Sequence, residues 1–106
     1  MTPKVQTILA ELKQRLTALY GERLVRLVLF GSQARGDATA ESDIDTLVVL
    51  RGPVNAGEEI RRTSACGAAL SLKHDVLVSC VFVSADSFRQ EQSPLLLNVR
   101  REGVAV

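Results

Sequence analysis

Apolar and polar residues alternate with two different periods along the chain. Over residues 5–20, apolar side chains recur every three or four positions, which is the spacing of one helix face. Thr2 and Pro3 are a typical helix start, and Gly21 follows the last apolar position. We therefore predict an amphipathic helix that ends at Gly21. Its buried stripe consists of Val5, Ile8, Leu9, Leu12, Leu16, Leu19 and Tyr20.

Runs of β-branched and aliphatic residues predict buried strands. They span residues 24–30, 44–50 and 76–83. A further short edge strand is expected within residues 103–106. The segment between the first two strands is too long for a tight hairpin, and we expect one or two helical turns in it.

Helical patterns return between and after these strands. Residues 58–73 have helical spacing, Ser84 is a typical N-cap of a short helix, and Ser93 with Pro94 opens another. This succession of helices and strands is typical of the α/β (α+β) class. We predict a single domain over residues 1–106, built as a small mixed β-sheet with helices packed on it.

Composition and charge narrow the function classes. Apolar residues make up 46% of the 106 residues and charged residues 24%, as in ordinary globular domains. A net charge of +1 provides no basic field for a long nucleic acid, so duplex binding is disfavoured. Lys13 and Arg15 interrupt the first apolar stretch, so we expect neither a signal peptide nor a membrane span. Cys66 and Cys80 form no disulfide framework, and as free thiols they favour a cytoplasmic protein.

Two aspartates stand at the start of the second predicted strand. Asp43 and Asp45 are two positions apart, and side chains at that spacing on a strand point to the same face. Two close carboxylates repel each other unless a cation lies between them, so the pair favours a hard divalent ion such as Mg²⁺. The alternative is a turn whose acids are simply solvated.

A glycine and a serine follow the first predicted strand. Gly31 allows close backbone approach, and Ser32 with the free N–H groups of a helix start offers donors to anionic oxygens. Alone, this pair would indicate an ordinary strand-to-helix turn. Together with Asp43 and Asp45 it predicts a complementary site, with phosphates held at one strand end and metal at the next.

The connector and the strand after it resemble the signature of a known superfamily. The matching residues are Gly31-Ser-Gln-Ala-Arg-Gly36, Ser42-Asp-Ile-Asp45 and Leu47-Val-Val-Leu50, and Asn98-Val-Arg-Arg-Glu-Gly103 is similar to its final helix. This pattern resembles the polymerase-beta-like nucleotidyltransferases, most closely their minimal nucleotidyltransferase (MNT) branch. The resemblance implies the fold of that superfamily.

The resemblance also implies roles for the residues that carry it. Gly31 and Ser32 would bind a nucleoside triphosphate, with ATP as the first choice, and Asp43 and Asp45 would hold two Mg²⁺ ions. An acceptor hydroxyl would then attack the α-phosphate and release pyrophosphate. This chemistry depends mainly on positioning and charge neutralisation, which these residue types provide.

Arg35 and Gly36 complete the motif. Arg35 is a candidate ligand for the phosphates, and it is equally placed to form a salt bridge with Asp37 or Glu41 that fixes the connector. Gly36 is expected to serve the backbone conformation rather than a ligand.

The third carboxylate of the superfamily is less clear in this sequence. Asp75 is the acid available near the third predicted strand, and the two-residue period puts it in phase with Ser79. We expect Asp75 to be a third catalytic and metal-binding carboxylate, or else a solvated acid at the strand start. Counting back from Ser84 places the superfamily's acid near Val81, which binds no metal. His74 is expected at the strand edge without a catalytic role.

The resemblance further implies a protein partner. MNT proteins commonly act as antitoxins beside a helical HEPN-domain ribonuclease toxin, some of them by adding AMP to a toxin tyrosine. We therefore expect an enzyme that moves a nucleoside monophosphate from Mg²⁺·ATP to a hydroxyl of a partner macromolecule. The alternative is a catalytically weak or inactive module that neutralises its partner by binding. A transferase for a small molecule is less favoured, because little chain is left to build its pocket.

Overall fold

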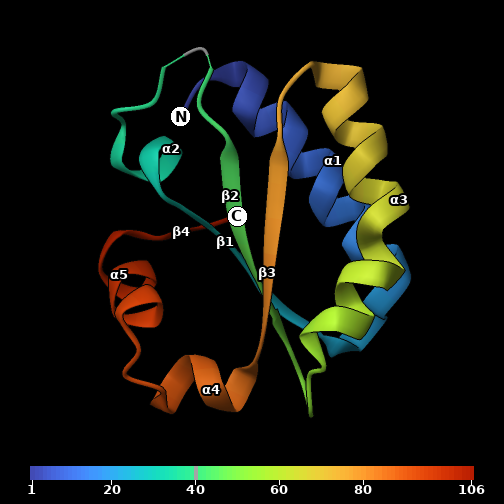
Figure 1. Cartoon of the computed structure of the whole chain (residues 1–106), viewed down its shortest axis with the longest axis vertical. Helices are drawn as coiled ribbons and strands as arrows, with labels where there is room; N and C mark the ends of the chain where they lie inside the picture. The colour runs from blue at the N-terminus through green and yellow to red at the C-terminus, as the bar shows by residue number, and fades with distance from the viewer. Residues whose placement is uncertain (40) are drawn as a thin grey trace.

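The structure is a computed structural model that describes residues 1–39 and 41–106, so Ala40 of the connector lies outside the described residues. Its centre is a four-stranded sheet in the order β3-β2-β1-β4. The strands are β1 (Leu24–Phe30), β2 (Ile44–Leu50), β3 (Val78–Ser84) and β4 (Val104–Ala105). β1 is antiparallel to β2 and β4, whereas β2 and β3 are parallel. The predicted mixed sheet is confirmed, and β3 lies at one edge of it (Figure 1).

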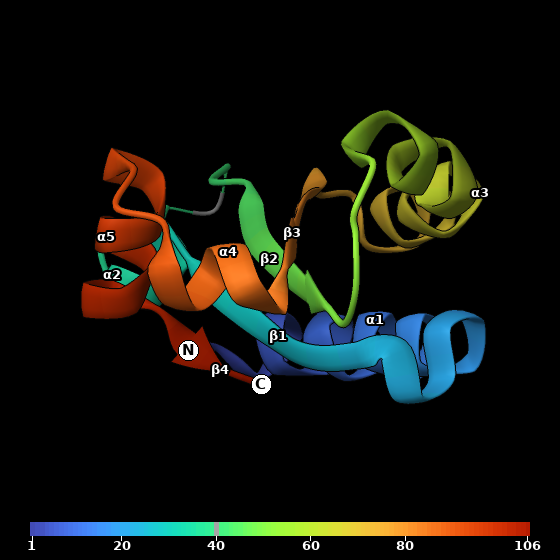
Figure 2. The same ribbon diagram turned by 90° about the horizontal axis from the view of Figure 1, so that it is seen from below.

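Helices cover both faces of this sheet. α1 (Pro3–Tyr20) and α3 (Ala56–His74) pack on one face, and α4 (Ala85–Gln90) and α5 (Pro94–Glu102) pack on the other. Figure 2 shows α1 and α3 on one side of β2 and β3, with α4 and α5 on the opposite side. The 3₁₀ turn η1 (Gly21–Arg23) joins α1 to β1, and the one-turn helix α2 (Ser32–Arg35) follows β1.

Alternation along the strands divides the core into two clusters. Even-numbered residues of β2 and β3 face α1 and α3, and odd-numbered residues face α4 and α5. Leu47 of β2 and Val81 of β3 lie in this second, smaller cluster, which we call the α4/α5 cluster. Most of the predicted stripe of α1 is buried, but Leu19 is 46% exposed. The strand period therefore determines which face each side chain of the site reaches.

Polar side chains begin four of the helices. Thr2, Asn55, Ser84 and Ser93 each accept a hydrogen bond from the backbone N–H three residues ahead. The predicted starts at Ser84 and Ser93 are thus confirmed. α3 begins at Ala56, earlier than the predicted residue 58, because Asn55 caps it.

The expected start of the third strand at Val76 is wrong. β3 begins at Val78, because α3 continues to His74 and Asp75 ends it in the left-handed conformation, with φ 52° and ψ 50°. Ser71 stabilises this junction. Its carbonyl accepts a hydrogen bond from the N–H of Val76, and its hydroxyl accepts one from the N–H of Val78, both at 3.2 Å.

His74 lies at the end of α3 and not at a strand edge as expected. Its Nε2 is 3.2 Å from Oε2 of Glu11, and Lys73 Nζ is 3.0 Å from Oε1 of the same carboxylate. Hydrogen bonds from Lys73 and His74 lower the pKa of Glu11. His74 therefore ties α3 to α1.

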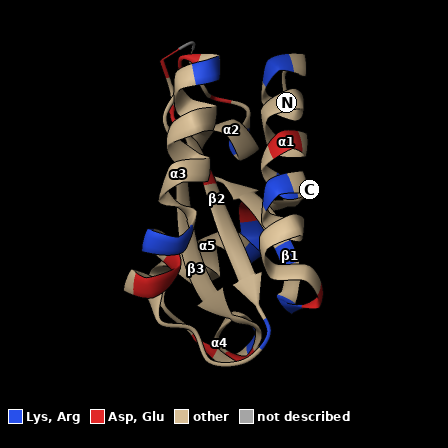
Figure 3. Ribbon diagram, turned by 90° about the vertical axis from the view of Figure 1, so that its right-hand side faces the viewer, with Lys and Arg blue, Asp and Glu red and all other residues tan. Residues whose placement is uncertain are grey.

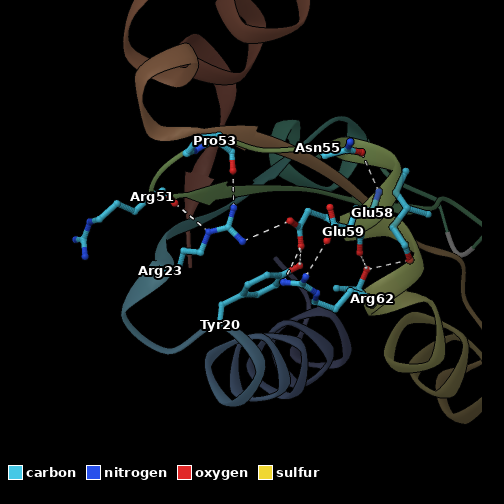
Figure 4. Close-up of polar contacts among 10 residues, drawn as sticks. Tyr20, Arg23, Arg51, Pro53, Asn55, Glu58, Glu59 and Arg62 are labelled. Carbon is cyan, nitrogen blue, oxygen red and sulfur yellow. Dashed lines mark hydrogen bonds and ion pairs between the residues drawn. The ribbon is translucent and has the colours of Figure 1, made fainter.

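A buried polar cluster closes the end of the strands opposite to the connector. Tyr20 donates a hydrogen bond to Glu59 at 2.7 Å, and the guanidinium groups of Arg23 and Arg62 lie 3.4 and 3.5 Å from the same carboxylate (Figure 4). Arg23 also donates to the carbonyl of Pro53 at 2.6 Å. Burial and the hydrogen bond to Glu59 raise the pKa of Tyr20, so its phenol stays protonated and donates.

Charge, cysteines and helix hydrophobicity complete the description of the fold. In Figure 3, β2 and β3 are free of charged residues along most of their length. Cys66 and Cys80 are free thiols and partly buried. In the described ranges, no helix has both the length and the apolar character needed to cross a membrane.

Candidate active site

The site lies where β1 ends and β2 begins. The antiparallel register pairs Phe30, the last residue of β1, with Asp45 near the start of β2. Gly31 follows with φ 74° and ψ −156°, a conformation that favours glycine. A Cβ at this position would lie 2.6 Å from Oδ2 of Asp45. Gly31 therefore places bare backbone directly against a carboxylate, which any larger residue would prevent.

α2 begins at Ser32 and lasts one turn. The N–H groups of Ala34 and Arg35 donate to the carbonyl of Gly31 at 3.1 Å, and that of Gly36 donates to the carbonyl of Ser32 at 3.0 Å. Gly36 ends the turn in the left-handed conformation, which agrees with its expected backbone role. The first N–H groups of any helix have no acceptor within that helix. Here they lie next to the Ser32 hydroxyl, and together they are suitable donors for phosphate oxygens.

The two aspartates of the connector interact electrostatically. Asp43 is exposed, whereas Asp45 is half-buried on the sheet face that carries the α4/α5 cluster. Burial raises the pKa of Asp45, the Asp43 carboxylate raises it further, and Arg35 lowers it. These effects indicate that Asp43 and Arg35 each lie within electrostatic reach of Asp45.

This donor set fits a divalent cation. Carboxylate oxygens are the ligands that Mg²⁺ prefers, and Asp43 and Asp45 supply them from positions two residues apart at the start of β2. A cation would offset both the burial of Asp45 and its repulsion by Asp43, which are the two causes of its raised pKa. The bare backbone of Gly31 keeps the space beside Asp45 free of a side chain.

Arg35 forms ion pairs on the connector and across to α5. Its Nε is 3.2 Å from Asp37, which confirms one of the two expected salt bridges, and its Nη1 is 3.5 Å from Glu102. The alternative pairing with Glu41 is not among the ion pairs of the described residues. Glu102 was not anticipated, because no local pattern connects residues 67 positions apart. The ion pair joins α2 to the end of α5.

Asp75 lies apart from the aspartate pair. It ends α3 on the other side of the sheet and lines a surface hollow with Glu41 and Leu77. Among residues 1–39 and 41–106, no group of three or more His, Cys, Asp or Glu side chains is placed to hold a metal. The structure therefore brings Asp43 and Asp45 together without Asp75, because Asp75 ends α3 in a turn that precedes β3 and does not belong to the strand.

Ser79 was not given a role from the sequence, yet it lies beside Asp45. The parallel register pairs Asp45 with Ser79, and it pairs Leu47 with Val81. Val81 is consequently one row deeper, in the α4/α5 cluster, and not level with Asp45. The sequence could have predicted this neighbour. Aligning the ends of the two strands at Leu50 and Ser84 pairs Asp45 with Ser79.

Comparison with known proteins assigns the chain to a family. A family model described as a nucleotidyltransferase domain matches residues 7–93, most of the chain, and the match includes Gly31, Ser32 and both aspartates. The chain belongs to the nucleotidyltransferase domain family. The resemblance seen in the sequence is confirmed, and the function class of this domain is that of a nucleotidyltransferase.

Two relatives of this nucleotidyltransferase come from Methanocaldococcus jannaschii. Each is named "Putative protein adenylyltransferase", with the designations MJ0141 and MJ0604. MJ0141 is 35% identical over 72 residues, which cover 68% of this chain and 72% of the relative. MJ0604 is 37% identical over 81 residues, which cover 76% of this chain and 75% of the relative.

Solved structures share the nucleotidyltransferase fold. A toxin–antitoxin crystallised with AMP-PNP has a TM-score of 0.62 at 23% identity and covers 90% of this chain and 70% of its own. A mutant of the toxin–antitoxin MntA-HpeT has a TM-score of 0.61 at 22% identity and covers 92% and 70%. At this level of identity the likeness concerns the fold, which matches the predicted class.

Proposed function

We propose that this nucleotidyltransferase transfers AMP from Mg²⁺·ATP to a hydroxyl group of a partner protein, as the antitoxin of a pair whose toxin is a HEPN-domain protein. The observation that carries the proposal is the contact between Gly31 and Asp45, because it joins a turn of backbone donors to a carboxylate pair. The names of the two relatives support an adenylyl group. The structures with AMP-PNP and with HpeT support ATP and a toxin partner.

Each residue has a separate task in this proposal. Asp43 and Asp45 hold two Mg²⁺ ions, while Ser32 and the backbone at Gly31 hold the phosphates. Arg35 adds a positive charge on the same side. When bound, the metal ions neutralise the phosphate charge and stabilise the entering and leaving oxygens.

The proposed transfer is an in-line displacement. The acceptor oxygen forms a bond to the α-phosphorus while the bond from that phosphorus to the pyrophosphate oxygen breaks, and the acceptor proton passes to water. The chain's own residues position the triphosphate and neutralise its charge. We place the reaction in the cytoplasm, in line with the two free thiols Cys66 and Cys80.

A second candidate function is neutralisation of the partner by binding alone. The position of Asp75 favours it, because the aspartate pair is not joined by that third acid. Both candidates require a stable complex with the partner. They differ in whether a nucleotide is transferred.

The test is a labelling experiment. The chain is incubated with Mg²⁺, ATP labelled in the α-phosphate and a candidate HEPN-domain protein that is co-purified with it or encoded by a neighbouring gene, and labelled protein is detected on a denaturing gel. We expect label on the partner. The double variant Asp43→Asn with Asp45→Asn should lose the label while keeping its folded circular dichroism spectrum.

A matched control uses two exposed acids far from the site. Asp86→Asn with Glu91→Gln removes the same charge from the surface near α4 and should label the partner as the wild type does. Label that persists in the Asp43 and Asp45 variant contradicts the assignment of the metal site. A stable complex without label, across all four nucleoside triphosphates and with Mn²⁺, contradicts transfer and supports binding alone.

A further inference from the structure

A single row of side chains crosses the sheet at the site. The antiparallel register pairs Asp45 with Phe30 of β1, and the parallel register pairs it with Ser79 of β3. Paired residues on neighbouring strands lie about 5 Å apart with their side chains on the same face. Asp45 and Ser79 are both odd-numbered and share the face of the α4/α5 cluster. Ser79 is therefore the immediate neighbour of Asp45 on the side of β3.

The position of Ser79 is held by its backbone. The buried hydroxyl of Thr46 donates to the carbonyl of Ser79 at 2.9 Å, in addition to the pairing of β2 with β3. The Ser79 side chain is exposed, and its hydroxyl has no hydrogen-bond partner in the described part of the chain. A fixed backbone with a free hydroxyl suits a residue that contacts a ligand.

The position of Ser79 on an edge strand determines which ligand can contact it. β3 is the edge strand, so Ser79 lies between Asp45 and the open side of the sheet. The other side of Asp45 is occupied by Gly31 and α2, and the ion pair between Arg35 and Glu102 joins α2 to α5 there. In the proposed function the triphosphate takes the side of Gly31, and the acceptor approaches across β3.

The chemistry of a serine differs from that of an acid at this point. A carboxylate beside Asp45 would bind a cation directly and accept a proton, whereas a serine hydroxyl is neutral and is a weak ligand and base at neutral pH. Val81 is one row too deep, and Asp75 lies on the side of α1 and α3. Ser79 is thus the residue of β3 that is level with the aspartate pair.

We propose that Ser79 is the third position of this site and that its neutral hydroxyl positions the acceptor without taking the acceptor proton. The inference rests on the proposed function and deepens it. In the transfer the acceptor oxygen bonds to the α-phosphorus, pyrophosphate leaves, and the acceptor proton passes to water. A serine at this position limits both the metal affinity and the rate of transfer.

The experiment adds a negative charge at position 79. Ser79→Asp adds a carboxylate beside Asp45. The control is Ser79→Asn, which adds a side chain of the same shape as Asp but without its charge. Mn²⁺ binding is measured by calorimetry in the presence of α,β-methylene-ATP, and transfer to the partner is measured as kcat and KM with labelled ATP. We expect Ser79→Asp to bind Mn²⁺ roughly tenfold more tightly and to raise kcat by about the same factor, with KM for the partner unchanged.

Folding is monitored in the same series. Without metal, the new carboxylate repels Asp45, so Ser79→Asp should have a lower Tm than Ser79→Asn, and Mn²⁺ with the nucleotide analogue should remove the difference. If Ser79→Asp does not fold, Ser79→Ala takes its place, and a lowered kcat with unchanged Tm is the expected result. Unchanged kcat in a folded Ser79→Ala overturns the inference.

The outcomes separate this inference from the proposed function. If wild type transfers AMP but Ser79→Asp changes Mn²⁺ affinity and kcat by less than twofold, Ser79 is not the third position and the proposed function stands. If no variant transfers AMP but Ser79→Asp alone tightens Mn²⁺ binding, the position of Ser79 is supported and the proposed transfer fails. If Ser79→Asn changes Mn²⁺ affinity and kcat as much as Ser79→Asp does, the charge at position 79 is not the cause, and this part of the inference is overturned.

Discussion

Asp45 combines partial burial, a neighbouring negative charge and close contact with backbone. It is half-buried, it lies beside another carboxylate, and Gly31, which follows β1, places backbone without a side chain against it. In the absence of a cation, an ionised Asp45 is therefore unfavourable in the folded chain. Such an arrangement is typical of a functional site, because it lowers stability unless a ligand compensates it.

Replacing Asp45 should make the metal-free protein more stable at neutral pH. Its pKa is raised on folding, so the folded state loses stability as pH rises through that pKa and regains it when the carboxylate is protonated. Asp45→Asn should raise the free energy of unfolding at pH 7 in EDTA, because it removes the partly buried, repelled carboxylate. The difference should disappear near pH 3.

Urea unfolding at the two pH values measures this effect. Asp86→Asn, a change at an exposed acid of α4, is the matched control and should show no comparable gain at pH 7. A lower stability of Asp45→Asn at pH 7 would contradict the unfavourable environment of the ionised carboxylate.

The elements are joined by polar contacts at both ends of the sheet. At the connector, Arg35 links α2 to Glu102 of α5, a partly exposed pair that contributes little to stability. At the opposite end, Glu59 of α3 is 3% exposed and bonds to Tyr20 of α1. The buried contact matters more, because a polar group without water needs its partners.

Removing the Tyr20 hydroxyl should weaken the packing of α1 against α3. Tyr20→Phe leaves Glu59 with Arg23 and Arg62 but without its shortest hydrogen bond. We expect a loss of about 1–2 kcal/mol in the free energy of unfolding, measured in urea with an unchanged m-value. The proposed AMP transfer should be unaffected, because the cluster lies at the far end of the strands.

A double-mutant cycle controls this prediction. Glu59→Gln keeps the shape of the side chain and still accepts a hydrogen bond. The cycle of Tyr20→Phe and Glu59→Gln therefore measures the coupling free energy between the Tyr20 hydroxyl and the negative charge of Glu59. Additive losses from the two changes would show that Tyr20 and Glu59 are not coupled.

At the scale of the whole molecule, the site exists only when β1, α2 and β2 are assembled. Gly31 and Asp45 are brought into contact by the strand register, so an unfolded chain has no comparable site. A ligand that binds the folded state alone stabilises it by mass action. In the proposed function, binding of nucleotide and metal would therefore be coupled to global stability.

Thermal unfolding should report this coupling. Mg²⁺ with α,β-methylene-ATP at 100 times its Kd should add about 2.7 kcal/mol, which corresponds to a rise in Tm on the order of 10 °C. EDTA should reverse the rise. The double variant Asp43→Asn with Asp45→Asn should show no rise, and an equal rise in that variant would place the nucleotide elsewhere.

The local features of this protein can be predicted from its amino-acid sequence. The period of apolar residues predicts α1, β1 and β2, and serine start signals predict α4 and α5, because helices and strands bury one face at a regular spacing. The motif at Gly31, Ser32, Asp43 and Asp45 is nearly contiguous, so it is readable along the chain. The family follows from the same residues.

The distant residues that join this motif are brought to it by the packing of the fold. The start of β3 depends on how far α3 continues, and its register against β2 depends on packing of the crossover helix, so neither follows from a two-residue period. The register places Ser79 beside Asp45 and leaves Asp75 on the other side of the sheet. The pairing of Arg35 with Glu102 has the same origin, because contacts between remote segments form only when the sheet and its two helical layers assemble.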